Sequence, residues 1–363
     1  MSHLYGLILA GGRGTRFWPR SRRSRAKQVL NFFGDRTLIQ QTVDRLKPLL
    51  PPDRIWILTN HHLRAEIVAQ LPEVPPHQIL AEPAQRNTAP AIGLAAQIIS
   101  KLDPEAVMGV FPADHVIAKP RAYLQLLRPA FKAAGQGKIA VIGIQPRWAE
   151  TGYGYIEFVK KQLPKQATGA RTTTAVDVTS FREKPDSKTA AKFIKAKNFY
   201  WNAGMFFWRT SVLLDNLRRF QPKTAALLAS LPPITDPQFA PKLEAVFPLC
   251  KDISIDYAVL EHANNVVGIP AGDIGWSDVG SWNAVYELHK RDAQGNALLA
   301  ASIVEKSTGN YVEAGKKMVA LLGVKDLIIV DTPDALLIAD RSRAQEVGDL
   351  VKRLEKAGHD HLL

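Results

Sequence analysis

The chain has 363 residues, of which 47 are Lys or Arg and 34 are Asp or Glu, so its formal net charge is +13 and it contains a single cysteine. One cysteine excludes a disulfide-stabilised scaffold, the apolar fraction of 46% excludes intrinsic disorder, and no apolar run reaches the roughly 18 residues of a membrane span. No Lys or Arg precedes the first apolar run and glycines follow it at once, so we interpret it as a buried strand and not as a signal peptide. We expect Cys250 to be a buried apolar residue in a reducing compartment and the protein to be cytoplasmic.

Short apolar runs alternate with segments of helical period through the first 144 residues. This alternation is typical of a mostly parallel, Rossmann-like sheet with helices on both faces. Thr37 is a predicted helix start, because Gln40 can complete a capping box with it, and Pro48 ends that helix. The other predicted elements of this part are strands at residues 4–10, 54–59, 78–81, 106–111 and 138–143, and helices at residues 61–70, 90–101 and 122–134.

The pattern changes after Pro146. Two strand-like segments, 153–160 and 173–181, flank a loop rich in Lys, Gln and Thr, and residues 200–209 form an aromatic strand, which together extend the same sheet. We assign its aromatic residues to the core and not to sugar stacking; they are Trp201, Phe206, Phe207 and Trp208. Predicted helices at 211–220 and 255–262 follow.

A small β-rich domain is expected from residue 296 onward. Short β-like runs at 302–305, 318–323, 327–331 and 335–339 precede an amphipathic helix at 344–357. The sequence therefore predicts a catalytic α/β domain at residues 1–295 and a C-terminal β-rich domain with a terminal helix at residues 296–363.

The segment 9–16 (LAGGRGTR) is a glycine-rich turn after the first strand. Its three glycines permit positive φ and close approach to a ligand, and the amides of such a turn can point at a phosphate. The spacing fits neither the P-loop nor the dinucleotide fingerprint, whose third glycine would fall on Phe17. Cations without any acidic residue then run from Arg13 to Lys27, which favours a polyphosphate ligand. Within this run we interpret three as solvated surface charges: Arg22, Arg23 and Arg25.

This turn, followed by Trp18-Pro19 and Lys27-Gln28, resembles the signature of the sugar-phosphate nucleotidylyltransferases, in particular the mannose-1-phosphate guanylyltransferases. The chain departs from the family's usual residues at Arg13, Phe17 and Ala26, none of which removes a group that the reaction needs. Further matching segments follow in order; they are Glu82-Pro83, 86–90 (RNTAP), 111–115 (FPADH), 151–156 (TGYGYI), 181–185 (FREKP), 201–205 (WNAGM), 276–282 (WSDVGSW) and 330–336 (VDTPDAL).

The resemblance implies a nucleotidyltransferase that transfers GMP from GTP to mannose 1-phosphate, giving GDP-mannose and pyrophosphate. A sugar-phosphate oxygen would attack the α-phosphorus in line, with Mg²⁺ held by Asp114 and Asp278. In this reading Arg16 contacts the triphosphate and Lys27 bridges the reacting phosphates. The implied nucleotide-binding residues are Leu9, Ala10, Gly11, Gly12, Gly14, Thr15, Arg16, Glu82, Asn87, Thr88, Pro112 and Asp114.

On the sugar side the resemblance implies that Lys184 grips the phosphate of the sugar phosphate and that Glu183 accepts hydrogen bonds from sugar hydroxyls. Gly154 and Asn202 complete this side. The implied catalytic residues are Arg16, Lys27, Asp114, Lys184 and Asp278.

Three alternatives stay open at this point. The chain could be a related nucleotidylyltransferase with another nucleotide or sugar, a polyanion-binding protein, or a regulatory relative without catalysis. No nucleic-acid module is evident, and the five implied catalytic residues are all present. We expect neither nucleic acid nor membrane as a partner, the β-rich tail is compatible with a homodimer, and no phosphomannose isomerase activity is expected.

Overall fold

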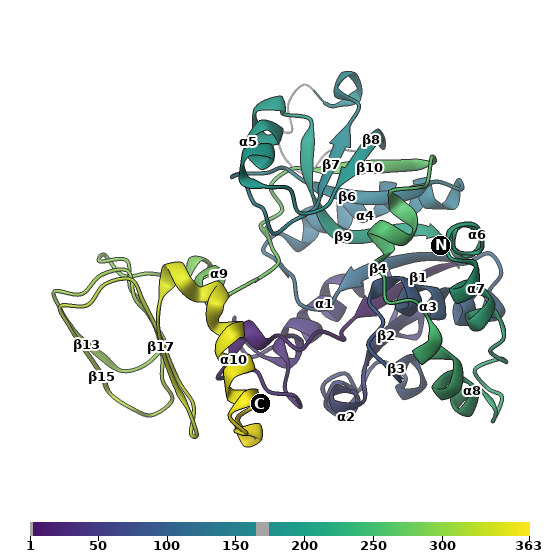
Figure 1. Ribbon diagram of the computed structural model, residues 1–363. Helices are drawn as coiled ribbons and strands as arrows, with labels where there is room; N and C mark the ends of the chain where they lie inside the picture. The colour runs from purple at the N-terminus through teal and green to yellow at the C-terminus, as the bar shows by residue number, and fades with distance from the viewer. Residues whose placement is uncertain (1–2, 165–173) are drawn as a thin grey trace.

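The computed structural model describes residues 3–164 and 174–363, so Thr173 and the loop before it, where the second strand of the predicted pair was expected to begin, lie outside the described residues. Its centre is a nine-stranded sheet in the order β3-β2-β1-β4-β9-β6-β10-β8-β7 (Figure 1). All of these strands share one direction except β8 and β9. The strands are β1 (Leu4–Leu9), β2 (Ile55–Asn60), β3 (Ile79–Glu82), β4 (Val107–Pro112), β6 (Ile139–Ile144), β7 (Tyr155–Phe158), β8 (Val176–Arg182), β9 (Phe199–Arg209) and β10 (Val266–Ala271).

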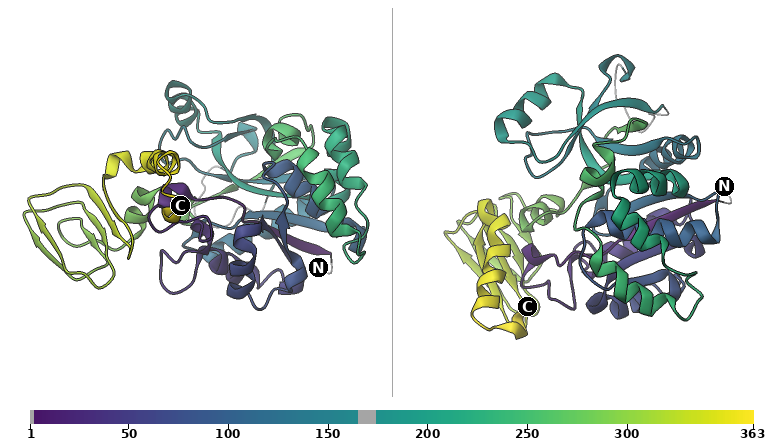
Figure 2. Two further views of the ribbon diagram at one scale, coloured as in Figure 1. Left: turned by 60° about the horizontal axis from the view of Figure 1, so that its bottom comes forward. Right: turned by 45° about the vertical axis from the view of Figure 1, so that its right-hand side comes forward.

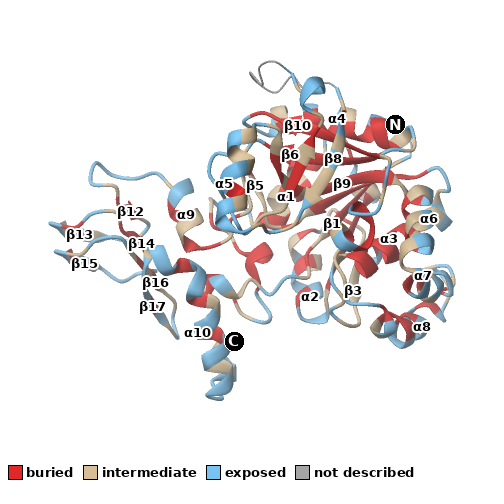
Figure 3. Cartoon of the chain, turned by 45° about the horizontal axis from the view of Figure 1, so that its top comes forward, coloured by how far each residue is buried: buried red, intermediate tan, exposed pale blue. Residues whose placement is uncertain are grey.

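Helices cover both faces of this sheet. Apolar residues of α1, α2 and α4 form one core cluster with one face, and those of α3, α6, α7 and α8 form a second cluster with the other face. The bounds are α1 (Leu38–Leu46), α2 (His61–Gln70), α3 (Thr88–Leu102), α4 (Pro120–Gly135), α5 (Ser187–Ala196), α6 (Thr210–Phe220), α7 (Pro222–Ala229) and α8 (Phe239–Val246). Both core clusters bury the strands between them, as the red interior in Figure 3 shows, which explains the continuous apolar runs of β1, β2, β4 and β6. Strand β8 differs, because it has polar residues and exposed positions along its length.

The elements predicted in the first 144 residues are present with ends that differ by at most two residues. Thr37 caps α1 and forms the expected capping box with Gln40. The aromatic residues of β9 are buried, which confirms their assignment to the core, and Cys250 is also buried. Within the part of the chain that the structure describes, there is no helix with the length and apolar character to span a membrane.

Strand β10 was not predicted, although it lies inside the sheet between β6 and β8. Gly268 and Pro270 interrupt its apolar run, and both residues usually argue against a central strand. The ring of Phe158 explains the glycine, because a Cβ at position 268 would lie 2.1 Å from that ring. The predicted helical stretch at 255–262 is present but shorter, as a single π-helical turn at Asp256–Leu260.

Beyond residue 296 the chain builds stacked parallel coils. One sheet has the order β12-β14-β16-β17 and a second pairs β13 with β15, with only β17 antiparallel to its neighbour. The C-terminal helix α10 then returns to the first part of the chain and lies beside residues 13–23, as both views in Figure 2 show. These elements are β12 (Ala297–Leu298), β13 (Ser302–Glu305), β14 (Tyr311–Glu313), β15 (Val319–Leu322), β16 (Leu327–Asp331), β17 (Leu336–Asp340) and α10 (Val347–Lys356).

A third apolar cluster joins the two parts of the chain. Phe17 and Trp18 pack in it against Trp282 of α9 (Trp282–Leu288) and against Val347 and Val351 of α10. The Trp18 indole also donates a hydrogen bond to the carbonyl of Leu362 at 3.0 Å. The segment after the glycine-rich turn is therefore fixed to the C-terminal part by burial and not only by charge.

Candidate functional site

The glycine-rich turn follows directly from β1, and its carbonyl groups are held by side chains from neighbouring segments. Gln28 donates from Nε2 to the carbonyls of Ala10 at 2.6 Å and Gly12 at 3.0 Å, and Thr59 donates to Ala10 at 3.0 Å. Within residues 3–164 and 174–363, the amides of Gly12, Arg13 and Gly14 have no protein acceptor. The turn therefore presents free N–H groups, which is the arrangement that favours an anion.

The expectation of positive φ holds at only one of the three glycines. Gly14 has a φ of 63°, whereas Gly11 and Gly12 are not in the left-handed region. A Cβ at Gly14 would lie 2.6 Å from the Cβ of Lys27. Gly14 thus allows the turn to pass close to Lys27, which a larger residue would prevent.

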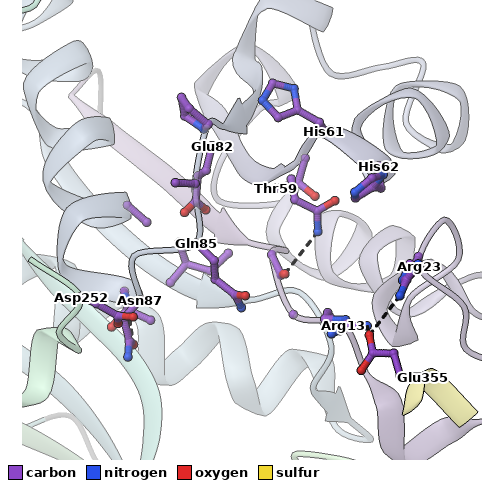
Figure 4. Close-up of a pocket in the computed structure, with 18 residues that line it drawn as sticks. Arg13, Arg23, Thr59, His61, His62, Glu82, Gln85, Asn87, Asp252 and Glu355 are labelled. Carbon is purple, nitrogen blue, oxygen red and sulfur yellow. Dashed lines mark hydrogen bonds and ion pairs between the residues drawn. The ribbon is translucent and has the colours of Figure 1, made fainter. Parts of the chain in front are cut away.

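A pocket of about 770 Å³ opens beside this turn (Figure 4). It is lined by one group of the expected nucleotide residues: Leu9, Gly11, Gly12, Glu82, Asn87 and Thr88. The other expected residues lie outside its lining. Ala10 is buried beneath the turn, Gly14, Thr15 and Arg16 continue from it, and Pro112 and Asp114 lie at the end of β4.

Glu82 is the acidic side chain deep on one side of this pocket. Burial raises the pKa of Glu82 to about 7, and the Cβ position of Gly11 lies 3.6 Å from its Oε1. A carboxyl group in this state can accept hydrogen bonds from a ligand, and no charged group among the described residues shifts its pKa. On the same side, Thr88 accepts a hydrogen bond from the amide of Ile255 at 2.9 Å and so joins α3 to the 253–256 segment.

Lys27 lies at the centre of the site and connects the two expected metal-binding aspartates. Its Nζ donates to Asp114 Oδ2 at 2.9 Å and to the backbone carbonyl of Asp278 at 2.5 Å, and the side chain is only 7% exposed. Burial alone would raise the pKa of Asp114, but the nearby charge and hydrogen bond of Lys27 outweigh it and hold the pKa below its ordinary value. The structure thus brings together three of the five expected catalytic residues.

A short antiparallel pair explains how Asp278 reaches Asp114 across more than 160 residues of chain. Strand β11 (Trp276–Ser277) pairs with β5 (Val116–Ile117), which directly follows the Asp114 segment. Trp276 also donates from its indole to Nδ1 of His115 at 3.2 Å. Burial lowers the pKa of His115 to about 4, so the imidazole is neutral and its Nδ1 is free to accept.

Tyr153 is a site residue that the sequence reasoning did not single out. Its hydroxyl donates to Asp278 Oδ1 at 2.5 Å, and its ring packs edge-on against Trp201 and Trp276. Burial and the carboxylate of Asp278 raise the pKa of Tyr153 well above its ordinary range, so the hydroxyl keeps its proton. Its position next to Gly154, within a segment already assigned to the sugar side, is the signal that could have identified it.

The expected sugar-side residues also gather in one place. The backbone N–H of Asn202 donates to the carbonyl of Gly154 at 2.8 Å. A Cβ at Gly154 would lie 2.5 Å from Oε2 of Glu183. Lys184 is 64% exposed, contacts Glu183 at 3.1 Å and has a φ of 41°, an unusual value for a residue with a side chain. A side chain at position 154 would thus displace the carboxylate of Glu183 from its present position.

Asp256 contacts the side chain of Asn202 and is a second site residue that the sequence reasoning did not single out. It accepts from Asn202 Nδ2 at 2.8 Å, while Asn202 Oδ1 accepts from the amide of Gly204 at 3.0 Å. Burial raises the pKa of Asp256 to about 6, and the negative charge of Glu183 adds to this effect. These contacts fix the orientation of the Asn202 amide.

The arginines after the glycine-rich turn pair with acidic and polar residues of the C-terminal part. Arg16 donates to Gln345 at 2.6 Å. The interpretation of Arg22 as a solvated charge was wrong, because its side chain is only 15% exposed and pairs with Asp334 at 2.9 Å. Arg23 pairs with Glu355 at 3.0 Å, and Arg25 is exposed.

Asp114 and Asp278 suit a hard cation such as Mg²⁺, since both offer carboxylate oxygens beside the turn that presents free amides. Among the described residues, no group of three or more His, Cys, Asp and Glu side chains could hold a metal ion. A two-carboxylate set is appropriate for an ion that keeps several positions for phosphate oxygens and water.

Comparisons with known proteins cover nearly the whole chain. Residues 5–295 match the family model described as nucleotidyl transferase, and residues 302–354 match the model described as a MannoseP isomerase/GMP-like beta-helix domain. The mannose-1-phosphate guanylyltransferase of Escherichia coli (strain K12) is 38% identical over 367 residues, which cover 99% of this chain and 75% of that protein.

Two further relatives are similar over nearly the whole chain. The alginate biosynthesis protein AlgA of Pseudomonas aeruginosa is 37% identical over 97% of this chain and 72% of its own length. A crystal structure from Thermus thermophilus, described as mannose-1-phosphate geranyltransferase, is 32% identical with a TM-score of 0.84 and covers 97% of this chain and 99% of its own.

Proposed function

Since the chain belongs to the nucleotidyl transferase family and is an enzyme of that type, we propose that it transfers GMP from GTP to mannose 1-phosphate, giving GDP-mannose and pyrophosphate. The observation that carries the proposal is the Lys27 ammonium between Asp114 and the Asp278 segment, at the junction of the nucleotide pocket and the sugar-side residues. Curated relatives named mannose-1-phosphate guanylyltransferase support the choice of nucleotide and sugar.

At the centre of the site, Lys27 would contact the reacting phosphates and stabilise the charge that develops as pyrophosphate departs. Its two present contacts, Asp114 and the carbonyl of Asp278, keep the ammonium in a fixed position before substrates bind. Arg16, next to the free amides of the turn, would hold the triphosphate. A divalent cation bound by Asp114 and Asp278 would neutralise phosphate charge and polarise the α-phosphate.

At the sugar end, Lys184 would bind the phosphate of mannose 1-phosphate and direct its oxygen toward the α-phosphorus. Glu183 and Asn202 would bind the sugar hydroxyls, with Asp256 and Gly204 orienting the Asn202 amide. The exposed position of the Lys184 side chain leaves it free to reach an incoming anion.

At the nucleotide end, the pocket beside the turn would hold the guanosine. Guanine presents N1–H and an exocyclic amine as donors, and Glu82 is a buried carboxyl group on the pocket lining that could accept from them. Asn87 and Thr88, at the start of α3, lie on the same lining and would meet the base and ribose.

The basic segment supports the enzyme over a polyanion-binding protein. Two of its arginines, Arg20 and Arg22, have side chains only 18% and 15% exposed and pair with carboxylates of the same chain. A surface for nucleic acid would need the cations of this segment free along one face. We also propose that residues 1–295 carry the catalytic site and that residues 296–363 form a small domain whose helix α10 supports the phosphate turn.

The experiment that tests the proposal is pyrophosphate release with Mg²⁺ across the common nucleoside triphosphates, each paired with mannose 1-phosphate, glucose 1-phosphate or fucose 1-phosphate. Release confined to GTP with mannose 1-phosphate is the expected result. Efficient release with another pair would keep the reaction type and overturn the specificity. The absence of pyrophosphate release with every pair would overturn the proposed reaction.

A further inference from the structure

Glu355, in the last turn of α10, reaches across to the phosphate turn. Its Oε1 accepts hydrogen bonds from Arg13 Nη2 at 3.1 Å and from Arg23 Nη2 at 3.0 Å, as Figure 4 shows. One carboxylate oxygen thus bridges two guanidinium groups. This is the contact pattern that a phosphate oxygen makes between two arginines.

The same three residues line the nucleotide pocket together with Gly11 and Gly12. The amides of Gly12 and Arg13, which have no protein acceptor among the described residues, belong to the same turn. The bridge is therefore part of the pocket rim and not a distant surface contact.

The helix itself does not favour a carboxylate at this position. Glu355 lies at the C-terminal end of α10, where the helix dipole is negative and a negative side chain is destabilising. The guanidinium of Arg23, followed by that of Arg13, holds the pKa of Glu355 below its ordinary value. The two arginines therefore keep the carboxylate in place against the local preference of the helix.

The bridge is also easy to exchange. The side chains of Arg13, Arg23 and Glu355 are 46%, 42% and 36% exposed, and ion pairs this open to water are weak. Arg23 also pairs with Asp360 at 3.2 Å, and the Asp360 side chain is 66% exposed, so this contact is equally open to water. A triphosphate carries several negative charges and can form bidentate contacts with arginine, so it would compete well against these two exposed carboxylates.

We propose that Arg13 and Arg23 form an additional anion subsite of the nucleotide pocket, for the phosphates that leave as pyrophosphate, and that Glu355 is an internal anion which the bound triphosphate displaces. This inference rests on the proposed function for the identity of the ligand. Trp18 still donates to the carbonyl of Leu362, and Phe17 still packs in one apolar cluster with Val347 and Val351 of α10 when Glu355 is displaced, so the helix remains docked.

The test is equilibrium binding of a GTP analogue with a methylene group between the α and β phosphorus atoms, compared with GMP, to the full chain by calorimetry. Because Glu355→Gln removes the competing charge but keeps the shape, it should bind the analogue about two- to fivefold tighter, with GMP affinity unchanged. The matched control is Glu346→Gln, which removes the same charge at the other end of α10, where Glu346 pairs only with Arg343.

Arginine variants test the subsite itself. Arg13→Gln should weaken binding of the analogue by about three- to tenfold and leave GMP binding unchanged. Arg36→Gln, an exposed arginine paired with Asp44 away from the pocket, controls for net charge.

Unchanged or weaker binding of the analogue by Glu355→Gln would overturn the inference, as would an equal change for GMP or in the Glu346→Gln control. If the wild-type chain binds the analogue but these variants do not separate it from GMP, the inference alone fails. If the wild-type chain binds no guanine nucleotide, the proposed function fails with it.

Discussion

The pKa values of buried carboxyl groups are shifted in opposite directions at the centre of the candidate site and at its two ends. At the centre, Lys27 holds the pKa of Asp114 below its ordinary value despite burial. At the nucleotide end, burial raises the pKa of Glu82 to about 7, and at the sugar end burial and the charge of Glu183 raise the pKa of Asp256 to about 6. Of these three carboxyl groups, Asp114 is the one that a cation contacts directly, through the ammonium of Lys27.

This difference assigns different tasks to the same functional group. A carboxylate whose charge is already compensated can bind a cation and remain ionised through the reaction. A carboxylate without a cationic partner gains most from accepting a hydrogen bond, from a guanine N–H at one end or through the Asn202 amide at the other. Changes at the centre should therefore affect turnover, and changes at the ends should affect substrate binding.

The largest effect is expected from Asp278→Asn. The variant loses one carboxylate of the expected metal pair, so pyrophosphate release should fall by about 100-fold or more at saturating substrates. Single-turnover rates measured over a range of Mg²⁺ concentrations check this. Asp273→Asn is the matched control, because Asp273 is an exposed aspartate of the same loop paired with Lys119. Equal rates for the Asp278 variant and the control would remove the distinction between the centre and the surface.

Lys184→Ala tests the division between the two ends. The KM for mannose 1-phosphate should rise about tenfold, because one charge-assisted contact to its phosphate is lost, while the KM for GTP should change little. The substitution should not change the backbone strain at this positive-φ position, because lysine and alanine both carry a Cβ. Steady-state kinetics with each substrate varied in turn provide the measurement, and an equal rise in both KM values would contradict the assignment.

Asp256→Asn should have a smaller effect, confined to the sugar end. An asparagine keeps one acceptor oxygen for Asn202 Nδ2 but loses the negative charge that strengthens this hydrogen bond, so the KM for mannose 1-phosphate should rise about three- to tenfold. In the wild-type chain the same KM should rise as the pH falls through about 6, because Asp256 becomes protonated there. The variant should lose this pH dependence. The range from about pH 5 to about pH 8 includes the pKa of Asp256 of about 6. A wild-type KM for mannose 1-phosphate that stays constant over this range would contradict the role of Asp256.

The smallest change in activity is expected from Glu82→Gln, where the clearest readout is stability. The folded-state pKa of about 7 lies above the ordinary value of 4.5, so Glu82 contributes stability below pH 4.5 that is lost as the pH rises through about 7. The glutamine variant should therefore be more stable than the wild type at alkaline pH, by about 1–3 kcal/mol, and lose the advantage in acid. Denaturant unfolding at several pH values measures this, and a pH-independent difference would contradict the pKa.

Local sequence signals predicted the regular part of the fold. The capping box of Thr37 and Gln40 and the alternation of apolar runs gave the elements around β1 to β6 because both depend on neighbours in the chain. Strand β10 was not predicted because its glycine, Gly268, leaves space for the ring of Phe158, a residue more than 100 positions away. Such a requirement exists only in the folded chain.

The candidate site divides in the same manner. Motif resemblance named Lys27, Asp114 and Asp278, but the hydrogen bonds that position them were not visible in the sequence. Tyr153 reaches Asp278 across 125 positions, and Glu355 reaches Arg13 across 342. No local pattern encodes such pairs, whose partners become neighbours only through packing of the sheet and of the C-terminal helix.

The proposed reaction is a direct displacement at the α-phosphorus, with the charge compensated by the residues at the centre and without an enzyme-bound intermediate. The stereochemistry of GMP transfer from the Sp isomer of guanosine 5′-(1-thiotriphosphate) to mannose 1-phosphate distinguishes this reaction from a two-step transfer. A direct displacement gives the α-thio analogue of GDP-mannose with inverted configuration at the phosphorus that carries the sulfur. Retention of configuration would exclude it, because retention requires two successive displacements through a covalent GMP-enzyme.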